Sequence, residues 1–173
     1  MTLCVLLAAL SALFLNQAAV PHIKAAEAAY EEGKTAQHDK QFQRAAEDFR
    51  KAIEIEPTFL DAHESLIASY LDAGQRLEAA AAMTQYLEIE PGAVKYRVLL
   101  GQILLEQKQP ERALAQFSLV LKRDPYNADG LLGFAAAARQ VGMKERADDA
   151  MERGRKHYPQ DARFKSSTGA TQP

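Results

Sequence analysis

The stretch GKTAQHDKQFQRAAEDFRKAIEIEP, residues 33–57, sets the pattern that most of the chain repeats. Several of its residues have counterparts of the same kind at steps of 34 residues. Three columns result: Ala45, Ala79, Ala113 and Ala147; Phe49, Met83, Phe117 and Met151; and Pro57, Pro91, Pro125 and Pro159. A fixed period of roughly 20 to 50 residues is the signature of stacked structural repeats. The chain is therefore divided into equal repeats before its other features are considered.

Four consecutive repeats follow when each proline is placed at position 32: residues 26–59, 60–93, 94–127 and 128–161, called repeats 1 to 4 below. Apolar residues within a repeat are three or four positions apart, which places them on one face of a helix. Proline cannot continue a helix, and Gly74 and Gly142 suit the left-handed position that ends one. The pattern predicts helices near residues 26–39, 42–55, 60–73, 76–89, 94–107, 110–123, 128–141 and 144–157.

This repeat resembles the tetratricopeptide repeat, a helix–turn–helix motif of the same length. The resemblance implies an all-α fold, a right-handed α-solenoid of four helical hairpins over residues 26–161, and a scaffold that binds other proteins. Alanine at position 20 lets the two helices of a hairpin approach closely, where a larger side chain would force them apart. The family's tryptophan-like position 4 differs here, because it holds Ala29, His63, Arg97 and Leu131.

The first twenty residues form an apolar segment. The run 3–15 is apolar except for Ser11, and Asn16 and Gln17 follow it. Its thirteen residues fit the hydrophobic region of a secretory signal, whereas a membrane-spanning helix needs about 20. No Lys or Arg precedes the run, and no small-x-small cleavage site follows it. Residues 1–20 are interpreted as a signal peptide or an uncleaved membrane anchor, with a helix packed on the repeats as a third alternative. The first two predict a periplasmic or extracytoplasmic protein, soluble or anchored to the membrane.

Short segments flank the repeats on both sides. Residues 21–25 are expected to be a linker, and residues 162–173, rich in Ser, Thr and Gly, a flexible C-terminal tail without a capping helix. The outer surface of the last helix, including Met151 or Tyr158, is then exposed. Gly154 makes this helix the least stable, since glycine inside a helix costs about 1 kcal/mol relative to alanine. The alternative function is a structural or assembly subunit that self-associates into an oligomer through this uncapped repeat.

Composition narrows the function classes. The formal net charge of −2 lacks the basic excess that nonspecific nucleic-acid binding needs. The single cysteine, Cys4, excludes an internal disulfide. The four histidines are far apart in sequence, none has a metal-ligand spacing, and no GxSxG, P-loop or GxGxxG motif occurs. We therefore expect no enzyme, no cofactor, no metal site and no nucleic-acid partner.

By resemblance, the first helix of each repeat lines an inner groove, with positions 2, 5, 9 and 12 pointing into it. The candidate groove residues carried over to this chain are Tyr30, Lys34, Glu64, Leu71, Val98, Gln102, Leu105, Leu132 and Arg139. Apolar anchors with polar residues at the rim suit an extended segment or a helix of a protein or peptide partner. The alternative is that the leucines pack against a neighbouring repeat or the N-terminal segment.

Chaperone-binding members of the family grip a C-terminal carboxylate with a clamp of Lys, Asn and Arg. The corresponding positions here hold Tyr30, Lys34, Ser65, Lys95 and Leu99. Only Lys95 matches the clamp, so binding of chaperone tails is not expected. The sequence as a whole predicts a protein-interaction scaffold that serves a bacterial envelope assembly.

Overall fold

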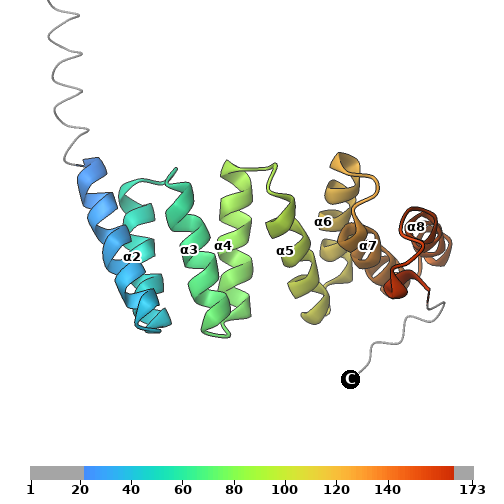
Figure 1. Ribbon diagram of the computed structural model, residues 1–173, viewed down its shortest axis with the longest axis horizontal. Helices are drawn as coiled ribbons and strands as arrows, with labels where there is room; N and C mark the ends of the chain where they lie inside the picture. Colours follow the sequence, from blue (N-terminus) through green and yellow to red (C-terminus); the bar gives the residue numbers. More distant parts are fainter. Residues whose placement is uncertain (1–21, 166–173) are drawn as a thin grey trace, which may run out of the picture. The chain divides into compact units, whose positions relative to one another are not determined.

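The computed structural model describes residues 22–165, and all regular structure in this part of the chain is helical (Figure 1). A first helix covers residues 22–38. Seven further α-helices and a 3₁₀ turn follow: α2 (Phe42–Ile55), α3 (Leu60–Asp72), α4 (Arg76–Ile89), α5 (Val94–Glu106), α6 (Pro110–Arg123), α7 (Ala128–Gln140), α8 (Lys144–His157) and η1 (Ala162–Phe164). The all-α prediction is confirmed for the described residues, which contain no strand.

The helix boundaries agree with the sequence pattern to within one residue in repeats 2 to 4. The second helices α2, α4, α6 and α8 have the predicted bounds, and the first helices end one residue earlier than predicted. Residues 22–25 differ from the prediction, because they are helical where a linker was expected. Lys24, Ala25 and Ala26 favour helix, and no Gly or Pro occurs between Lys24 and Gly33. Nothing in the sequence therefore interrupts a helix at residues 22–25.

The chain divides into two compact halves, Met1–Ala82 and Met83–Pro173, with the division inside α4. In the described part of the N-terminal half, α2 packs on α3, and Tyr30, Ile53 and Phe59 surround a small core. In the C-terminal half, α6 packs on both α5 and α7, α7 packs on α8, and α5 also lies against α7. Each half thus has its own set of packed hairpins.

The repeat columns occupy equivalent buried environments. The four alanines of position 20 have no exposed surface, and the Phe and Met residues of position 24 are buried in every repeat. A Cβ added to Gly33 would lie 2.6 Å from Phe49 Cε1, and one added to Gly101 would lie 2.7 Å from Phe117 Cζ. Glycine on the first helix therefore makes room for phenylalanine on the second, which confirms the register of the repeats.

All four first helices end in the same left-handed turn. The residue at position 15 has a positive φ in each repeat: 58° at Lys40, 73° at Gly74, 56° at Lys108 and 82° at Gly142. In repeat 3, the N–H of Lys108 donates to the Leu105 carbonyl at 3.0 Å and the N–H of Gln109 to the Leu104 carbonyl at 2.9 Å. This Schellman pairing satisfies carbonyls that the helix end leaves open. The glycine prediction is confirmed, and two lysines adopt the same turn.

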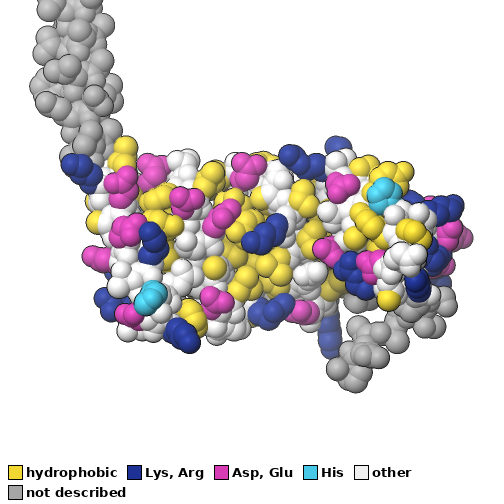
Figure 2. Space-filling model, in the orientation of Figure 1, with side chains coloured by type: hydrophobic (Ala, Val, Ile, Leu, Met, Phe, Trp, Pro, Cys, Tyr) yellow, Lys and Arg dark blue, Asp and Glu magenta, His cyan; other side chains and the backbone are white. Residues whose placement is uncertain are grey.

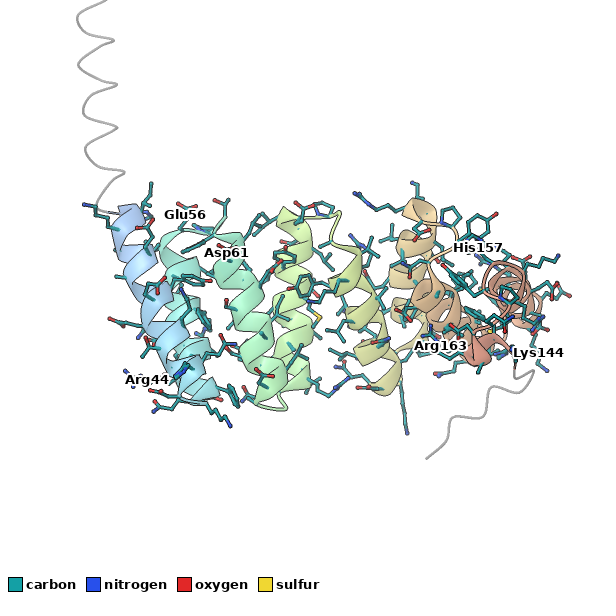
Figure 3. All side chains as sticks on the ribbon, viewed as in Figure 1. Arg44, Glu56, Asp61, Lys144, His157 and Arg163 are labelled. Atoms are coloured by element: carbon teal, nitrogen blue, oxygen red, sulfur yellow. The ribbon has the colours of Figure 1, made fainter. Side chains whose placement is uncertain are left out.

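The C-terminal tail begins with an ordered turn that closes the last repeat. Phe164 has no exposed surface, and a Cβ added to Gly154 would overlap its ring. Residues 162–164 correspond to positions 1 to 3 of a fifth repeat. Asp161 caps this turn by accepting the N–H of Arg163 at 3.0 Å. Arg163, labelled in Figure 3, also lies 2.8 Å from the Asp129 carboxylate on α7.

Phe164 belongs to a column of paired residues ten positions apart. Position 27 of one repeat meets position 3 of the next as Ala52 with Ala62, Tyr86 with Tyr96, Val120 with Gly130, and Gly154 with Phe164. In the last two pairs, a glycine faces the larger residue. Gly154 is therefore not only a weak point of α8, since its missing side chain provides the space that Phe164 fills.

This closure corrects two sequence predictions. Residues 162–164 are not a flexible tail, and residues 166–173 lie outside the described residues. The end of repeat 4 is not bare, because Met151 is buried and Tyr158 is half-buried. The Tyr158 ring stacks 5.8 Å from Phe164, and its hydroxyl donates to the Tyr126 carbonyl at 2.6 Å. The turn therefore covers part of the outer surface of repeat 4, and self-association through this repeat stays a prediction.

Changing Lys108 to glycine should stabilise the protein. A left-handed conformation costs a residue with a side chain roughly 1 to 2 kcal/mol, and part of this gain is offset by the greater freedom of glycine in the unfolded chain. We expect Lys108→Gly to raise the free energy of unfolding by about 0.5 to 1 kcal/mol in urea titrations. Gly142→Ala is the matched control and should lower it by about 1 kcal/mol. Equal effects of both changes would contradict the turn assignment.

Removing the Phe164 side chain should destabilise repeat 4. Truncating a fully buried phenylalanine typically costs about 3 to 5 kcal/mol. We expect Phe164→Ala to lower the urea midpoint and to increase amide hydrogen exchange in α8 more than in α6. Lys165→Ala changes an exposed neighbour and should stay within about 0.5 kcal/mol of the wild type. A Phe164→Ala protein as stable as the Lys165→Ala control would show that the turn closes nothing.

Candidate protein-binding surface

The accessible side of α5 combines a narrow polar stripe with apolar side chains. The buried side consists of Tyr96, Leu100, Gly101, Ile103 and Leu104. On the other side, Val98 and Leu105 are half-buried and Gln102 is exposed. Lys95, Gln102 and Glu106 form the exposed polar stripe that a surface helix normally carries opposite its core face. Val98 and Leu105 keep part of their surface accessible, so this side of α5 is suited to a further contact.

The neighbouring first helix, α7, continues the same surface. Leu132 and Arg139 are half-buried and Ala136 is exposed, whereas Leu131, Phe134 and Ala135 are buried. Leu132 and Arg139 are the repeat counterparts of Val98 and Leu105, and α5 and α7 lie against each other. We call Val98, Gln102, Leu105, Leu132 and Arg139 the α5–α7 strip. These five predicted groove residues therefore lie on two adjacent helices of the C-terminal half.

Arg139 is the charged member of the α5–α7 strip. Its Nη2 lies 3.3 Å from Asp148 Oδ1 on α8. The arginine side chain is 30% exposed and the aspartate 73% exposed, so this ion pair contributes little to stability. A partner carboxylate can therefore compete with Asp148 for the guanidinium, at the end of a row of apolar side chains.

The other four predicted groove residues lie in the N-terminal half. The Tyr30 ring is 5.5 Å from the Phe49 ring and 4.9 Å from the Phe59 ring, so it contributes to local packing. Lys34 is exposed, and its Nζ lies 2.9 Å from Glu31. The hydrogen bond from Lys34 to Glu31 raises the pKa of the lysine. Glu64 is exposed and Leu71 is half-buried. The one aromatic side chain of this set, Tyr30, is therefore already packed against the core.

Position 4, which departs from the family pattern, has a role that sequence reasoning missed. His63 is buried, as expected for a structural histidine, and its Nε2–H donates to the Pro57 carbonyl at 2.9 Å. Arg97 donates through Nη2 to the Pro91 carbonyl at 2.9 Å. In repeat 4, Arg153 at position 26 donates to the Pro125 carbonyl instead. Each of these proline carbonyls therefore has a side-chain donor, and the donor residue varies between repeats.

One hollow in the C-terminal half has mixed charge. It has a volume of about 460 Å³ and lies between α6 and α8, with Phe134 of α7 in its lining. The Arg146 guanidinium lies 5.1 Å from the centre of the Phe134 ring, and Arg153 lies 3.8 Å from Asp149. Both arginines of this hollow are thus engaged by groups of the protein itself, and Glu145 and Asp149 offset part of the positive charge of its lining.

The described residues offer neither a metal site nor a membrane span. Within residues 22–165, no three His, Cys, Asp or Glu side chains gather in a way that could hold a metal ion. No helix in the same range is long and apolar enough to cross a bilayer. The predicted signal peptide or anchor, residues 1–20, lies outside the described residues.

Comparison with known proteins identifies the class of protein. Models of the tetratricopeptide repeat match residues 26–59, 66–128 and 104–169. The chain therefore belongs to the tetratricopeptide repeat family, as its repeat pattern predicted.

Individual relatives are more distant. Human tetratricopeptide repeat protein 6 is 30% identical over 105 residues, 59% of this chain and 20% of that protein. Hsp70-Hsp90 organizing protein 1 of Glycine max is 25% identical over 125 residues, 72% of this chain and 22% of that protein. The chain thus spans about a fifth of the length of these two curated relatives.

Solved structures show the same fold. A crystal structure of YrrB, described as a TPR protein with an unusual peptide-binding site, matches with a TM-score of 0.66 at 21% identity, over 81% of this chain and 72% of that one. MamA from Desulfovibrio magneticus RS-1 matches with a TM-score of 0.67 at 16% identity, over 81% of this chain and 79% of that one. These similarities support the fold class, an all-α solenoid of tetratricopeptide hairpins.

Proposed function

We propose that this chain is a protein-interaction scaffold that binds a segment of a partner protein on the α5–α7 strip. The observation that carries the proposal is the pair of apolar side chains on the accessible side of α5, Val98 and Leu105, which lie one turn on either side of Gln102. Val98, Leu105 and Leu132 remain half-buried rather than buried or fully exposed. Covering their remaining surface would gain roughly 25 cal/mol for each Å² removed from water. YrrB, a TPR protein with a peptide-binding site, provides a precedent for this class of function.

The chemistry of the α5–α7 strip defines the kind of segment that fits. Apolar side chains of the partner would lie against Val98, Leu105 and Leu132. Gln102 and Arg139 would hydrogen-bond to polar groups of the partner and set its register. The similarity to an Hsp70-Hsp90 organizing protein does not extend to a carboxylate clamp, because only Lys95 matches that motif. The proposed partner is therefore not a chaperone tail.

Placing a carboxylate in the α5–α7 strip should weaken partner binding without unfolding the protein. A photo-crosslinking p-benzoylphenylalanine at Gln102, in cells of the source organism, reports on occupancy of the strip. We expect its adducts to fall about tenfold or more with Leu105→Glu, because a buried unpaired charge is costly at an interface.

Ala115→Glu adds the same charge at an exposed site of α6 and should leave the adducts unchanged. Circular dichroism melting would verify that both variants fold. Adducts that resist Leu105→Glu would place the partner elsewhere. Unfolding of Leu105→Glu alone would assign this leucine to the core.

Residues 1–20 are proposed to direct the protein out of the cytoplasm, as a signal peptide or a membrane anchor. Outside the cytoplasm, the scaffold would serve an envelope assembly. The support is their apolar composition and the length of the run 3–15. Intact mass spectrometry of the protein from soluble and membrane fractions tests this. A signal peptide predicts a mature protein that lacks the leader, and an anchor predicts the full mass in the membrane fraction. Full-length protein confined to the cytoplasm would contradict both.

A further inference from the structure

A basic pocket lies at one edge of the C-terminal half, between the first turn of α5 and the last turns of α6. Its volume is about 370 Å³, near the lower limit for ligand sites. Its apolar part consists of Pro91, Val94, Leu119 and Val120. Arg97, Lys122 and Arg123 supply its charge, and no acidic residue lines it. Figure 2 shows Lys and Arg side chains along the upper edge of the view, above α5 and α6. We call these seven residues the α5–α6 pocket.

Leu119 is the unusual residue of this pocket. It is 46% exposed, although it is a large aliphatic side chain on a helix surface. The same position, 26, holds Lys51, Gln85 and Arg153 in the other repeats. Only repeat 3 has an apolar residue where the others place a polar one. Since the position tolerates charge elsewhere, packing of the fold does not require leucine here.

The exposure of Leu119 follows from an exchange between two positions. Repeat 3 has Arg97 at position 4 and Leu119 at position 26, whereas repeat 4 has Leu131 at position 4 and Arg153 at position 26. In both repeats the arginine donates to the preceding proline carbonyl, Pro91 or Pro125. The structural hydrogen bond is therefore kept in both arrangements, but only the arrangement of repeat 3 leaves a leucine at the surface.

The cations of this pocket are only partly compensated. Arg97 donates to two neutral acceptors, the Pro91 carbonyl at 2.9 Å and Gln116 Oε1 at 3.0 Å, and burial lowers its pKa. The Arg123 guanidinium lies against Gly92, as does the Glu90 carboxylate, which accepts the Gly92 N–H at 3.2 Å. Ala93 provides no side-chain cap for α5, so the positive end of that helix adds to the field. The pocket is therefore suited to an anionic ligand.

We propose that the α5–α6 pocket binds a short acidic segment of a partner protein in which one large aliphatic side chain is flanked by carboxylates. The aliphatic side chain would contact Val94 and Leu119, and the carboxylates would bind Arg97, Lys122 and Arg123. A phosphodiester backbone matches the charge but offers nothing to the exposed leucine. This site is separate from the α5–α7 strip, because Leu105 and Leu132 do not line it.

Fluorescence anisotropy of a labelled peptide with the full chain tests the proposal. The probe has a single leucine between two pairs of glutamates, with glycines at both ends. We expect saturable binding that weakens with salt, since the contacts are between partly exposed charges. Replacing the glutamates by glutamines, or the leucine by alanine, should each weaken binding about tenfold or more.

The exchange seen in repeat 4 provides a matched variant. Arg97→Leu with Leu119→Arg gives repeat 3 the arrangement of repeat 4, so it should keep the melting temperature while weakening the peptide about tenfold or more. Leu105→Glu should bind the peptide with unchanged affinity. The proposal is overturned if the exchange variant binds as well as the wild type, if Leu105→Glu abolishes binding, or if the glutamine peptide binds equally. A short single-stranded RNA that competes as well as the unlabelled peptide would also overturn the proposal. Such a result would show that the pocket recognises negative charge and not the aliphatic side chain.

Discussion

The close approach of the two helices in each hairpin is the constraint on which the rest of the structure depends. It is set by the alanines of position 20, none of which has exposed surface. With this distance fixed, every larger side chain at the helix contacts needs space from another position. Phe117 shows the consequence most clearly, because glycines approach its ring from both sides, Gly101 on α5 and Gly133 on α7. Close packing therefore couples the choice of residue in one repeat to the choice in the next.

The same coupling between residues of adjacent repeats applies at the outer surface of repeat 4. A repeat solenoid leaves the outer surface of its last hairpin without a neighbour. Here Asp161–Phe164 forms a turn in the register of a further repeat, and Phe164 packs against Gly154 of α8. Tyr158 and His157 extend this closure, since His157 stacks on Tyr126 at 4.5 Å and packs edge-on against Tyr158. One short aromatic cluster thus shields the end that the sequence pattern left uncovered.

The sequence predicts this fold well because proline and periodicity are local signals. Each proline at position 32 stops a helix wherever it occurs, so the C-terminal ends of α2, α4, α6 and α8 follow from it. Signals that depend on distant partners are harder to read. Lysine is not a residue that predicts a left-handed turn, yet Lys40 and Lys108 adopt one. Likewise, a single phenylalanine in a polar segment does not predict that its side chain is buried, as that of Phe164 is. The donors to the proline carbonyls come from position 4 or position 26, so no single column reveals them.

The candidate surfaces were partly visible in the sequence for the same reason. Helical spacing places Val98, Gln102 and Leu105 on one side of α5, so an apolar pair beside a polar residue can be read from the sequence. The sequence does not reveal which leucine stays accessible, because the half-burial of Leu105 and the exposure of Leu119 depend on the neighbouring helices.

Charge illustrates the limit of whole-chain composition most sharply. The N-terminal half has 7 basic and 12 acidic residues, a formal charge of −5, and the C-terminal half has 14 and 11, a charge of +3. Together they give the chain's −2. The whole-chain value excludes a strong uniform field, but it conceals a basic half in which both candidate surfaces lie. Since exposed charges act mainly within a Debye length of about 8 Å in physiological salt, a partner approaching α5 experiences the local excess and not the total. The charge of this chain therefore favours acidic partners at its C-terminal half.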